Sequence, residues 1–197
     1  MNDPGFNPDP FPSPTINPRT VHDAKSHTFG DACFYTITFS ARDDDAGLSP
    51  VDHVAVVIAG NSGAPSNAGY WQTQYRPRPT AFTEARRQCY LAITGFMSAV
   101  FDEVRDASTV AKAFDVLFVG GNGGSPVQQL DRQLLTAWLN FANGGFEYTQ
   151  LVDTDGNGIP DTAFSAVLAN AESIRLNPAS TPDQLRAQRD LLERINA

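Results

Sequence analysis

The spacing of apolar residues changes once along this chain, and that change limits the folds open to it. Residues 33–41 (CFYTITFSA) and 51–59 (VDHVAVVIA) are rich in β-branched and aromatic side chains, which predicts two strands. The intervening RDDDAGLSP predicts a turn, so the strands form a β-hairpin. Beyond residue 80, apolar residues recur at spacings of three and four, which is typical of helices. We therefore expect an α+β protein: N-terminal antiparallel β structure, then a helical domain of about five helices.

The expected helices begin and end at recognisable residues. The first covers residues 81–104, and a short second helix follows Ser108 as its cap. Ser125 and Pro126 predict the start of a third helix that runs to about Ala142. Thr162 begins the fourth, which stops at Asn177 and Pro178, and the capping box Thr181–Gln184 opens the last. The inward side chains expected for residues 81–104 are Phe82, Ala85, Cys89, Ala92 or Ile93, Phe96 and Val100.

These elements divide the chain into four expected regions. Residues 1–19 contain repeated prolines, which favour an extended arm. Residues 20–60 form the β segment, residues 61–80 an irregular connecting loop, and residues 81–197 the helical domain. Because two strands alone are only marginally stable in water, we expect a partner chain or an upstream domain to complete the sheet.

The segment 151–162, LVDTDGNGIPDT, resembles a loop built to hold a cation. Asp153, Asp155, Asn157 and Asp161 would offer side-chain oxygens at positions 1, 3, 5 and 9, and Ile159 a backbone carbonyl at position 7. Gly158 stands at position 6, where a calcium loop needs a positive φ. Three carboxylates this close repel one another unless a cation neutralises them. We therefore predict one structural Ca²⁺, against the alternative of a polar turn that caps the next helix.

One ligand of the usual calcium loop is missing. Position 12 normally supplies a bidentate carboxylate, and Phe164 occupies it here. The remaining oxygen would come from water, from Glu147 or from Glu172. A calcium-sensor role is therefore not expected.

The two cysteines, Cys33 and Cys89, leave two interpretations open. They form a disulfide if the protein is secreted, or they are two free buried thiols. The start, MNDPGFNPDPFPSP, has neither the basic nor the apolar region of a signal peptide, so the chain is either cytosolic or a mature segment.

Charge and hydropathy exclude two classes of partner. The formal net charge is −8 with a pI near 4.7, whereas nucleic acids and anionic membranes require a basic face. No stretch approaches the roughly 18 consecutive apolar residues of a membrane span. We expect no nucleic-acid partner and no membrane span.

Three stretches resemble modules of bacterial surface proteins. CFYTITFSARDDDAGLSPVDHVAVVIA is similar to the last hairpin of immunoglobulin-like (Ig-like) modules in such proteins. GYWQTQ at 69–74 resembles the Gly-Tyr-Trp-Lys-Thr-His opening of a helical module, which continues with helices like LLTAWLNFANG and ends in Asn. Gln72 and Gln74 replace the usual lysine and histidine. DTDGNGIPD is similar to the calcium loops of thrombospondin type 3 repeats and dockerins.

This resemblance implies an extracellular or cell-surface module. We expect a non-enzymatic structural or interaction role in linkage, adhesion or assembly, with other copies or upstream domains as partners. One alternative is a self-assembling subunit, filamentous or surface-layer-like, that exchanges strands through its N-terminal arm. A second alternative is an enzyme whose site lies near Asp52, His53 and Tyr70, although no acid–base pair at a defined spacing supports it.

Overall fold

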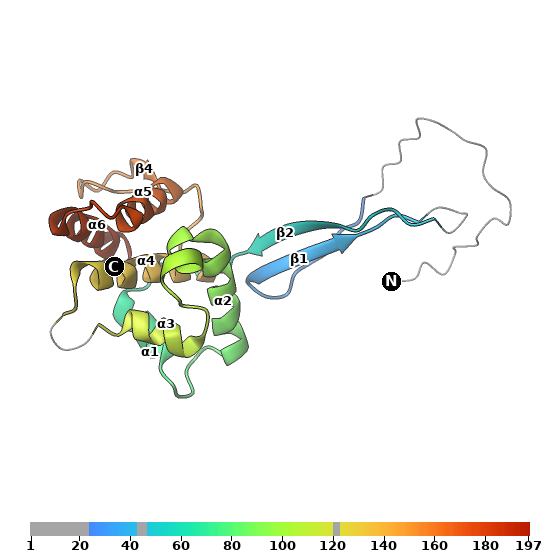
Figure 1. The fold of residues 1–197 in the computed structure, drawn as a ribbon, viewed down its shortest axis with the longest axis horizontal. Helices are drawn as coiled ribbons and strands as arrows, with labels where there is room; N and C mark the ends of the chain where they lie inside the picture. The colour runs from blue at the N-terminus through green and yellow to red at the C-terminus, as the bar shows by residue number, and fades with distance from the viewer. Residues whose placement is uncertain (1–23, 43–46, 120–122) are drawn as a thin grey trace. The chain divides into compact units, whose positions relative to one another are not determined.

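The computed structural model describes residues 24–42, 47–119 and 123–197 and confirms the expected α+β class (Figure 1). These residues divide into two units, one with 24–29, 35–42 and 47–56, the other with 30–34, 57–119 and 123–197. We refer to the described parts of these as the hairpin unit and the helical unit. Within the described residues, no helix combines the length and apolar character needed to cross a membrane.

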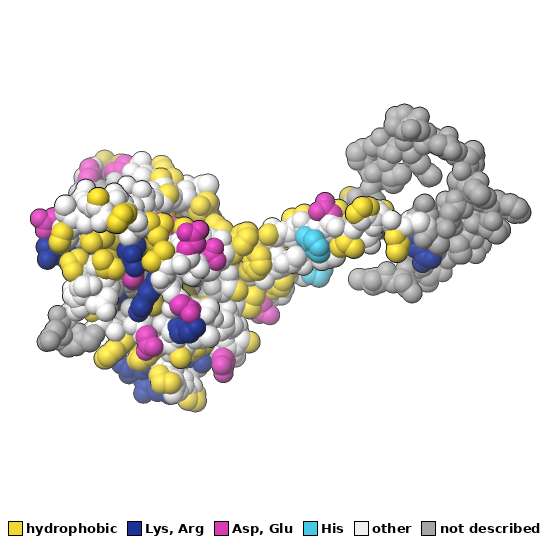
Figure 2. Space-filling model, in the orientation of Figure 1, with side chains coloured by type: hydrophobic (Ala, Val, Ile, Leu, Met, Phe, Trp, Pro, Cys, Tyr) yellow, Lys and Arg dark blue, Asp and Glu magenta, His cyan; other side chains and the backbone are white. Residues whose placement is uncertain are grey.

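The predicted hairpin is present as strands β1 (Cys33–Phe39) and β2 (Asp52–Ile58), which form a two-stranded antiparallel sheet. An antiparallel bridge between Arg42 and Leu48 continues the pairing toward the turn. Tyr35 packs against Phe29, with ring centroids 4.6 Å apart. Side chains of Ile37, Phe39 and Val54 nevertheless remain exposed, and Figure 2 shows hydrophobic side chains at the hairpin surface.

The helical unit is organised around the long helix α4 (Pro126–Asn143), which packs against every other α-helix of the unit. Because neighbours surround α4, apolar residues are buried on several of its faces, including Leu130, Leu135, Trp138 and Leu139. The remaining elements are α1 (Ala68–Tyr75), α2 (Glu84–Met97), the π-helical turn η1 (Val100–Val104), α3 (Val110–Leu117), α5 (Phe164–Leu176) and α6 (Pro182–Ile195), with the short strands β3 (Leu151–Val152) and β4 (Thr162–Ala163).

Two predicted helix starts are confirmed with their full hydrogen bonding. Ser125 accepts from the backbone N–H of Gln128, whose side chain accepts from the N–H of Ser125. Thr181 and Gln184 make the same reciprocal pair at the start of α6. A proline follows each cap and loses no hydrogen bond there, because the first N–H groups of a helix lack partners in any case.

Helix α1 lies where an irregular connection was expected. Its N-cap Asn67 accepts a hydrogen bond from Tyr70 N at 3.0 Å. Trp71, Gln74 and Tyr75 are buried, so a polar residue interrupts the apolar face. Helix α1 has eight residues and a mixed buried face, so its apolar periodicity is too weak to predict a helix. Tertiary packing stabilises this helix instead.

The helix predicted over residues 81–104 is divided in two. Helix α2 ends at Met97, and η1 begins at Val100. Between them, the Glu172 carboxylate accepts hydrogen bonds from Ser98 Oγ and from Ala99 N. A side chain from a distant helix thus satisfies the backbone where α2 ends.

The buried face of α2 is rotated from the predicted one. The residues it buries are Arg87, Tyr90, Leu91, Ile93 and Thr94. Ala85 and Phe96 are exposed instead, because the large Tyr90 side chain points into the core. Of the alternatives Ala92 and Ile93, Ile93 is the buried one, and Phe82 and Val100 are buried as predicted. Phe96 still has a partner, since its ring centroid lies 4.4 Å from that of Phe34.

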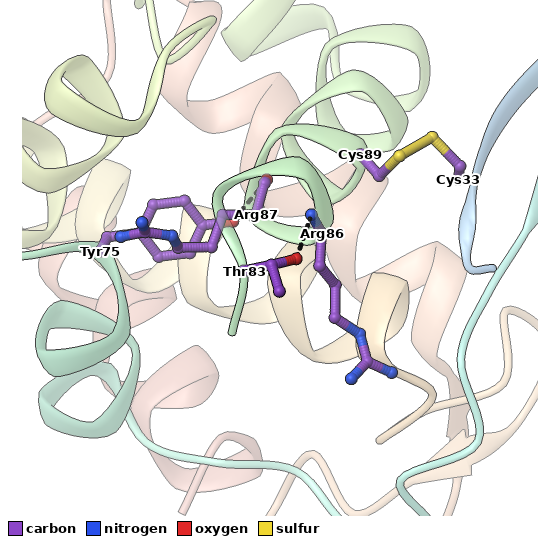
Figure 3. Close-up of a disulfide and its surroundings, with 6 residues drawn as sticks. All are labelled: Cys33, Tyr75, Thr83, Arg86, Arg87 and Cys89. Carbon is purple, nitrogen blue, oxygen red and sulfur yellow. Dashed lines mark hydrogen bonds between the residues drawn. A yellow bond between two sulfur atoms is a disulfide. The ribbon is translucent and has the colours of Figure 1, made fainter. Parts of the chain in front are cut away.

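Cys33 and Cys89 form a disulfide, as predicted for a protein from an oxidising compartment (Figure 3). Their Cα atoms are 4.6 Å apart, within the normal range for such a bond. The bond joins the first residue of β1 to the middle of α2, and both half-cystines belong to the helical unit. A disulfide is compatible with an extracellular location.

Candidate metal centre

The acidic loop Asp153–Asp161 is closed at its base by strands β3 and β4. These strands pair antiparallel, with Leu151 opposite Ala163 and Val152 opposite Thr162. Asp161 N donates to Val152 O at 3.0 Å, and Phe164 N donates to Gln150 O at 2.8 Å. Helix α5 begins directly after β4 at Phe164, two residues later than predicted, because Thr162 and Ala163 pair with β3.

Asp153 organises the first half of the loop. One carboxylate oxygen accepts from Gly156 N and the other from Gly158 N, both at 2.7 Å. Both glycines have positive φ, 82° and 84°, which non-glycine residues rarely adopt. The backbone therefore wraps around the Asp153 carboxylate, and the predicted role of Gly158 as a turn residue is confirmed.

The middle of the loop is held by Asp155 and Asn157. Asp155 accepts from the backbone and side-chain nitrogens of Asn157, at 3.0 and 2.9 Å. Asn157 Oδ1 accepts from Ile159 N at 2.7 Å, and the Ile159 side chain is exposed. These residues therefore lie next to one another in a ladder of side-chain to backbone hydrogen bonds.

Asp161 closes the loop by accepting from Thr154 Oγ1 at 2.7 Å and from Thr154 N at 3.3 Å. The Thr154 carbonyl accepts from the Arg194 guanidinium of α6. The start of the loop is thereby attached to α6, and its end continues through β4 into α5.

These contacts bring three of the predicted ligands together. One carboxylate oxygen each from Asp153, Asp155 and Asp161 lies within 4.8 Å of the other two. A carboxylate oxygen has two lone pairs, so an oxygen that accepts one hydrogen bond retains capacity for a cation. Three clustered carboxylates are oxygen donors suited to a hard cation such as Ca²⁺.

Hydrogen bonding favours the ionised form of two of these groups. The backbone N–H of Gly158, with that of Gly156, lowers the pKa of Asp153 below its ordinary value. The Thr154 and Thr162 hydroxyls lower the pKa of Asp161, against the opposing effects of desolvation and of the nearby Asp153 charge. Both carboxylates are therefore negatively charged at neutral pH.

Of the two carboxylates proposed as additional ligands, Glu172 has other hydrogen-bond partners. Glu172 is buried and accepts from Ser98 Oγ, Ala99 N and Trp138 Nε1, so it belongs to the core. Glu147 stands in the exposed turn after α4, where its carbonyl accepts from Gln150 N. Phe164, at position 12, is fully buried with its ring 4.4 Å from that of Phe146. Water and the Glu147 carboxylate remain candidates for the missing ligand.

A buried polar network in the helical unit was not predicted. Asn140 Oδ1 accepts from Trp71 Nε1 and from Ser66 N, both at 2.8 Å. Its amide nitrogen donates to Ser66 O at 2.9 Å and to Asn196 Oδ1 at 3.0 Å. The tryptophan of GYWQTQ, the first asparagine of LNFANG and the asparagine after the last helix thus meet at one place. In the sequence, only the joint occurrence of these three residues could have indicated this network.

The residues considered for an enzymatic site have other contacts. Asp52 accepts from the backbone N–H of His53 at 2.8 Å, and His53 Nδ1 lies 3.2 Å from Thr38 Oγ1. Both residues are on β2, whereas Tyr70 is on α1.

The chain matches no protein-family model, no curated protein and no solved structure.

Proposed function

We propose that this protein is a non-enzymatic extracellular or cell-surface module with a structural or interaction role, whose helical domain binds one Ca²⁺. The ligands would be Asp153, Asp155, Asn157 and Asp161 with the Ile159 carbonyl. The observation that carries the proposal is the convergence of three carboxylate oxygens within 4.8 Å in a loop closed by β3 and β4. The disulfide and the resemblance to bacterial surface modules support the extracellular setting.

A cation at this loop would stabilise the helical unit for a definite reason. The folded loop concentrates negative charge, whereas the unfolded chain separates it, so the ion prefers the folded state. Binding to the folded state stabilises it by RT ln(1 + [Ca²⁺]/Kd), about 2.7 kcal/mol at a concentration 100-fold above Kd. Because extracellular calcium sites bind with Kd values of roughly 10⁻⁴–10⁻³ M, even a weak site is useful there.

The test is calorimetric titration with CaCl₂, combined with thermal unfolding in calcium and in chelator. We expect a single binding event and a higher unfolding midpoint in calcium. Asp155→Asn should abolish both effects, because it removes one charge while sparing the backbone hydrogen bonds of Asp153. The matched control is Asp115→Asn on α3, which makes the same change at an exposed carboxylate outside the loop. Equal midpoints with and without calcium in the unaltered protein, with no heat of binding, would contradict the site.

Acid should weaken binding in a predictable range. The pKa values of Asp153 and Asp161 are lowered in the folded protein, so their stabilising interactions are present above the ordinary aspartate pKa of about 3.9. These interactions are lost as the pH falls through the lowered folded-state values. Calcium affinity should therefore be constant from pH 7 to pH 5 and decline only in more acidic solution. Titrations at several pH values measure this, and a loss of affinity near pH 6 would point to ligands other than these carboxylates.

A second candidate function, self-assembly, rests on the hairpin unit. Phe39, Val51 and Val54 are about half exposed, at 51%, 57% and 47%. Among the described residues this sheet has two strands, and a further strand could pair along an outer edge. Light scattering of the full chain and of a form without residues 1–28 tests strand exchange through the N-terminal arm. Assembly predicts a concentration-dependent mass that the truncation lowers, whereas a constant monomer mass for the full chain would rule it out.

A further inference from the structure

Four arginines gather in a short stretch of an otherwise acidic chain. Arg76, Arg78, Arg86 and Arg87 fall within twelve residues, and Glu84 is the one acidic residue among them. The net charge of the whole chain is −8, so this local excess of positive charge stands out. The Arg86 guanidinium lies over the rings of Phe82 and Tyr90, and these cation–π contacts stabilise its position.

Arg87 is buried without an acidic partner among the described residues. Only 8% of its surface is exposed. Its Nη1 donates to the carbonyls of Gln74 and Arg76, at 3.0 and 3.3 Å, and its buried Nε has no acceptor. Backbone carbonyls hold the guanidinium in place but carry no full negative charge, so its charge is only partly compensated.

Next to Arg87 is a cavity of about 490 Å³ between the α1–α2 connection and the start of α3. Its apolar lining comes from Tyr75, Pro77, Pro79, Val110 and Ala111. The Tyr75 hydroxyl donates to the Arg87 carbonyl at 3.0 Å, and Figure 3 shows these two residues beside each other. The volume falls in the range of small-molecule sites.

The charged lining of the cavity consists of Arg78, Arg87 and Glu84. Two guanidinium groups against one carboxylate leave a net positive charge beside an apolar surface. Arg87 is already fixed by backbone hydrogen bonds, so a ligand would not have to order it. Guanidinium groups match carboxylates in geometry and charge.

We propose that this cavity binds an organic carboxylate with an apolar portion. The carboxylate pairs with Arg87 and Arg78, and the apolar portion lies against Tyr75, Pro77 and Val110. The site shares no residue with the calcium loop, so either proposal can fail without the other.

Hexanoate is the probe, and hexyltrimethylammonium and acetate are its controls. Amide chemical shifts in two-dimensional NMR spectra locate the binding. We expect hexanoate to cause saturable shifts at Tyr75, Arg87 and Ala111 in the millimolar range. Acetate should bind more weakly because it lacks the apolar portion, and the cation should leave these amides unchanged.

Two variants separate the contributions of charge and shape. Arg78→Ala removes an exposed charge and should weaken hexanoate binding roughly two- to fivefold. Ala111→Phe fills the cavity from an exposed position on α3 and should abolish binding. Arg186→Ala is the matched control, because it removes an exposed arginine of α6 that does not line the cavity.

Thermal unfolding checks that each variant is folded. Equal shifts with hexanoate and the cation, an absence of saturation, or undiminished binding in both Arg78→Ala and Ala111→Phe would overturn the proposal.

Discussion

The hairpin unit and the helical unit differ in the burial of their apolar side chains. Residues 36–42 and 47–55 are all exposed in the hairpin unit, although Ile37, Phe39 and Val54 are among them. In the helical unit, Trp71, Tyr90 and Phe164 have no exposed surface. Each exposed apolar side chain forgoes the roughly 1.5–3 kcal/mol that burial would contribute.

The difference teaches that a strand pattern and a core are separate properties. Alternation in residues 33–41 specifies a pleated ribbon, but two strands contain nothing to cover either face. Helices α1 to α6 bring several faces together around α4 and cover one another. We therefore expect the stability of this protein to reside in the helical unit. Both tryptophans lie there, so their fluorescence reports its unfolding.

The largest expected effect is loss of the disulfide. Replacing Cys33 and Cys89 together by alanine should lower the free energy of unfolding by about 4 kcal/mol, because the bond closes a long loop in the unfolded chain. Urea denaturation followed by tryptophan fluorescence measures this. The oxidised and reduced natural protein provide the matched pair, and equal midpoints for these two forms would show that the bond is dispensable.

The second-largest loss of stability should follow from replacing Gly144. It ends α4 with φ 81°, and an added Cβ would lie 2.0 Å from the Gly60 carbonyl oxygen. Gly144→Ala should therefore cost about 3 kcal/mol, from overpacking together with the left-handed backbone. Gly95→Ala on α2 is the control, since open space surrounds that position, and helix propensity should make it stabilising by about 0.5–1 kcal/mol. Equal effects of the two substitutions would refute the close approach at Gly144.

The buried network around Asn140 should rank third. Asn140→Ala leaves Trp71 Nε1 and Asn196 Oδ1 without their hydrogen-bond partner and should cost about 2 kcal/mol. Asn170→Ala makes the same change at an exposed position of α5 and should be neutral or slightly stabilising. The urea unfolding midpoints of both variants measure these effects. An unchanged midpoint for Asn140→Ala would mean that water replaces the amide.

The smallest effect should be found in the hairpin unit. Phe39→Ser should change the tryptophan-detected unfolding free energy by less than about 0.5 kcal/mol, because the ring is half exposed. The same substitution at the buried Phe164 should cost at least about 3 kcal/mol. A large loss of stability from Phe39→Ser would show that the hairpin contributes to a core and would remove the contrast between the units.

Local sequence was sufficient for the features whose partners lie within a few residues. The capping boxes at Ser125 and Thr181, the hairpin and the glycine-dependent turn at Gly158 all belong to this group. In each, a side chain or a φ angle satisfies the backbone next to it, so the pattern is complete in the sequence. The gathering of Asp153, Asp155 and Asp161 followed from their spacing for the same reason.

Only the tertiary structure decided the features whose partners are distant in sequence. Helix α1 depends on Trp71 reaching Asn140, and the end of α2 at Met97 depends on Glu172, 74 residues beyond Ser98. Within the part of the chain that the structure describes, Arg87 lies beside a cavity without an acidic partner, and the string RPRPTAFTEARR does not indicate this. The physical reason is that a buried polar group needs a hydrogen-bond partner, and the fold can supply that partner from any part of the chain. The spacing of residues in the sequence does not indicate which residue it will be.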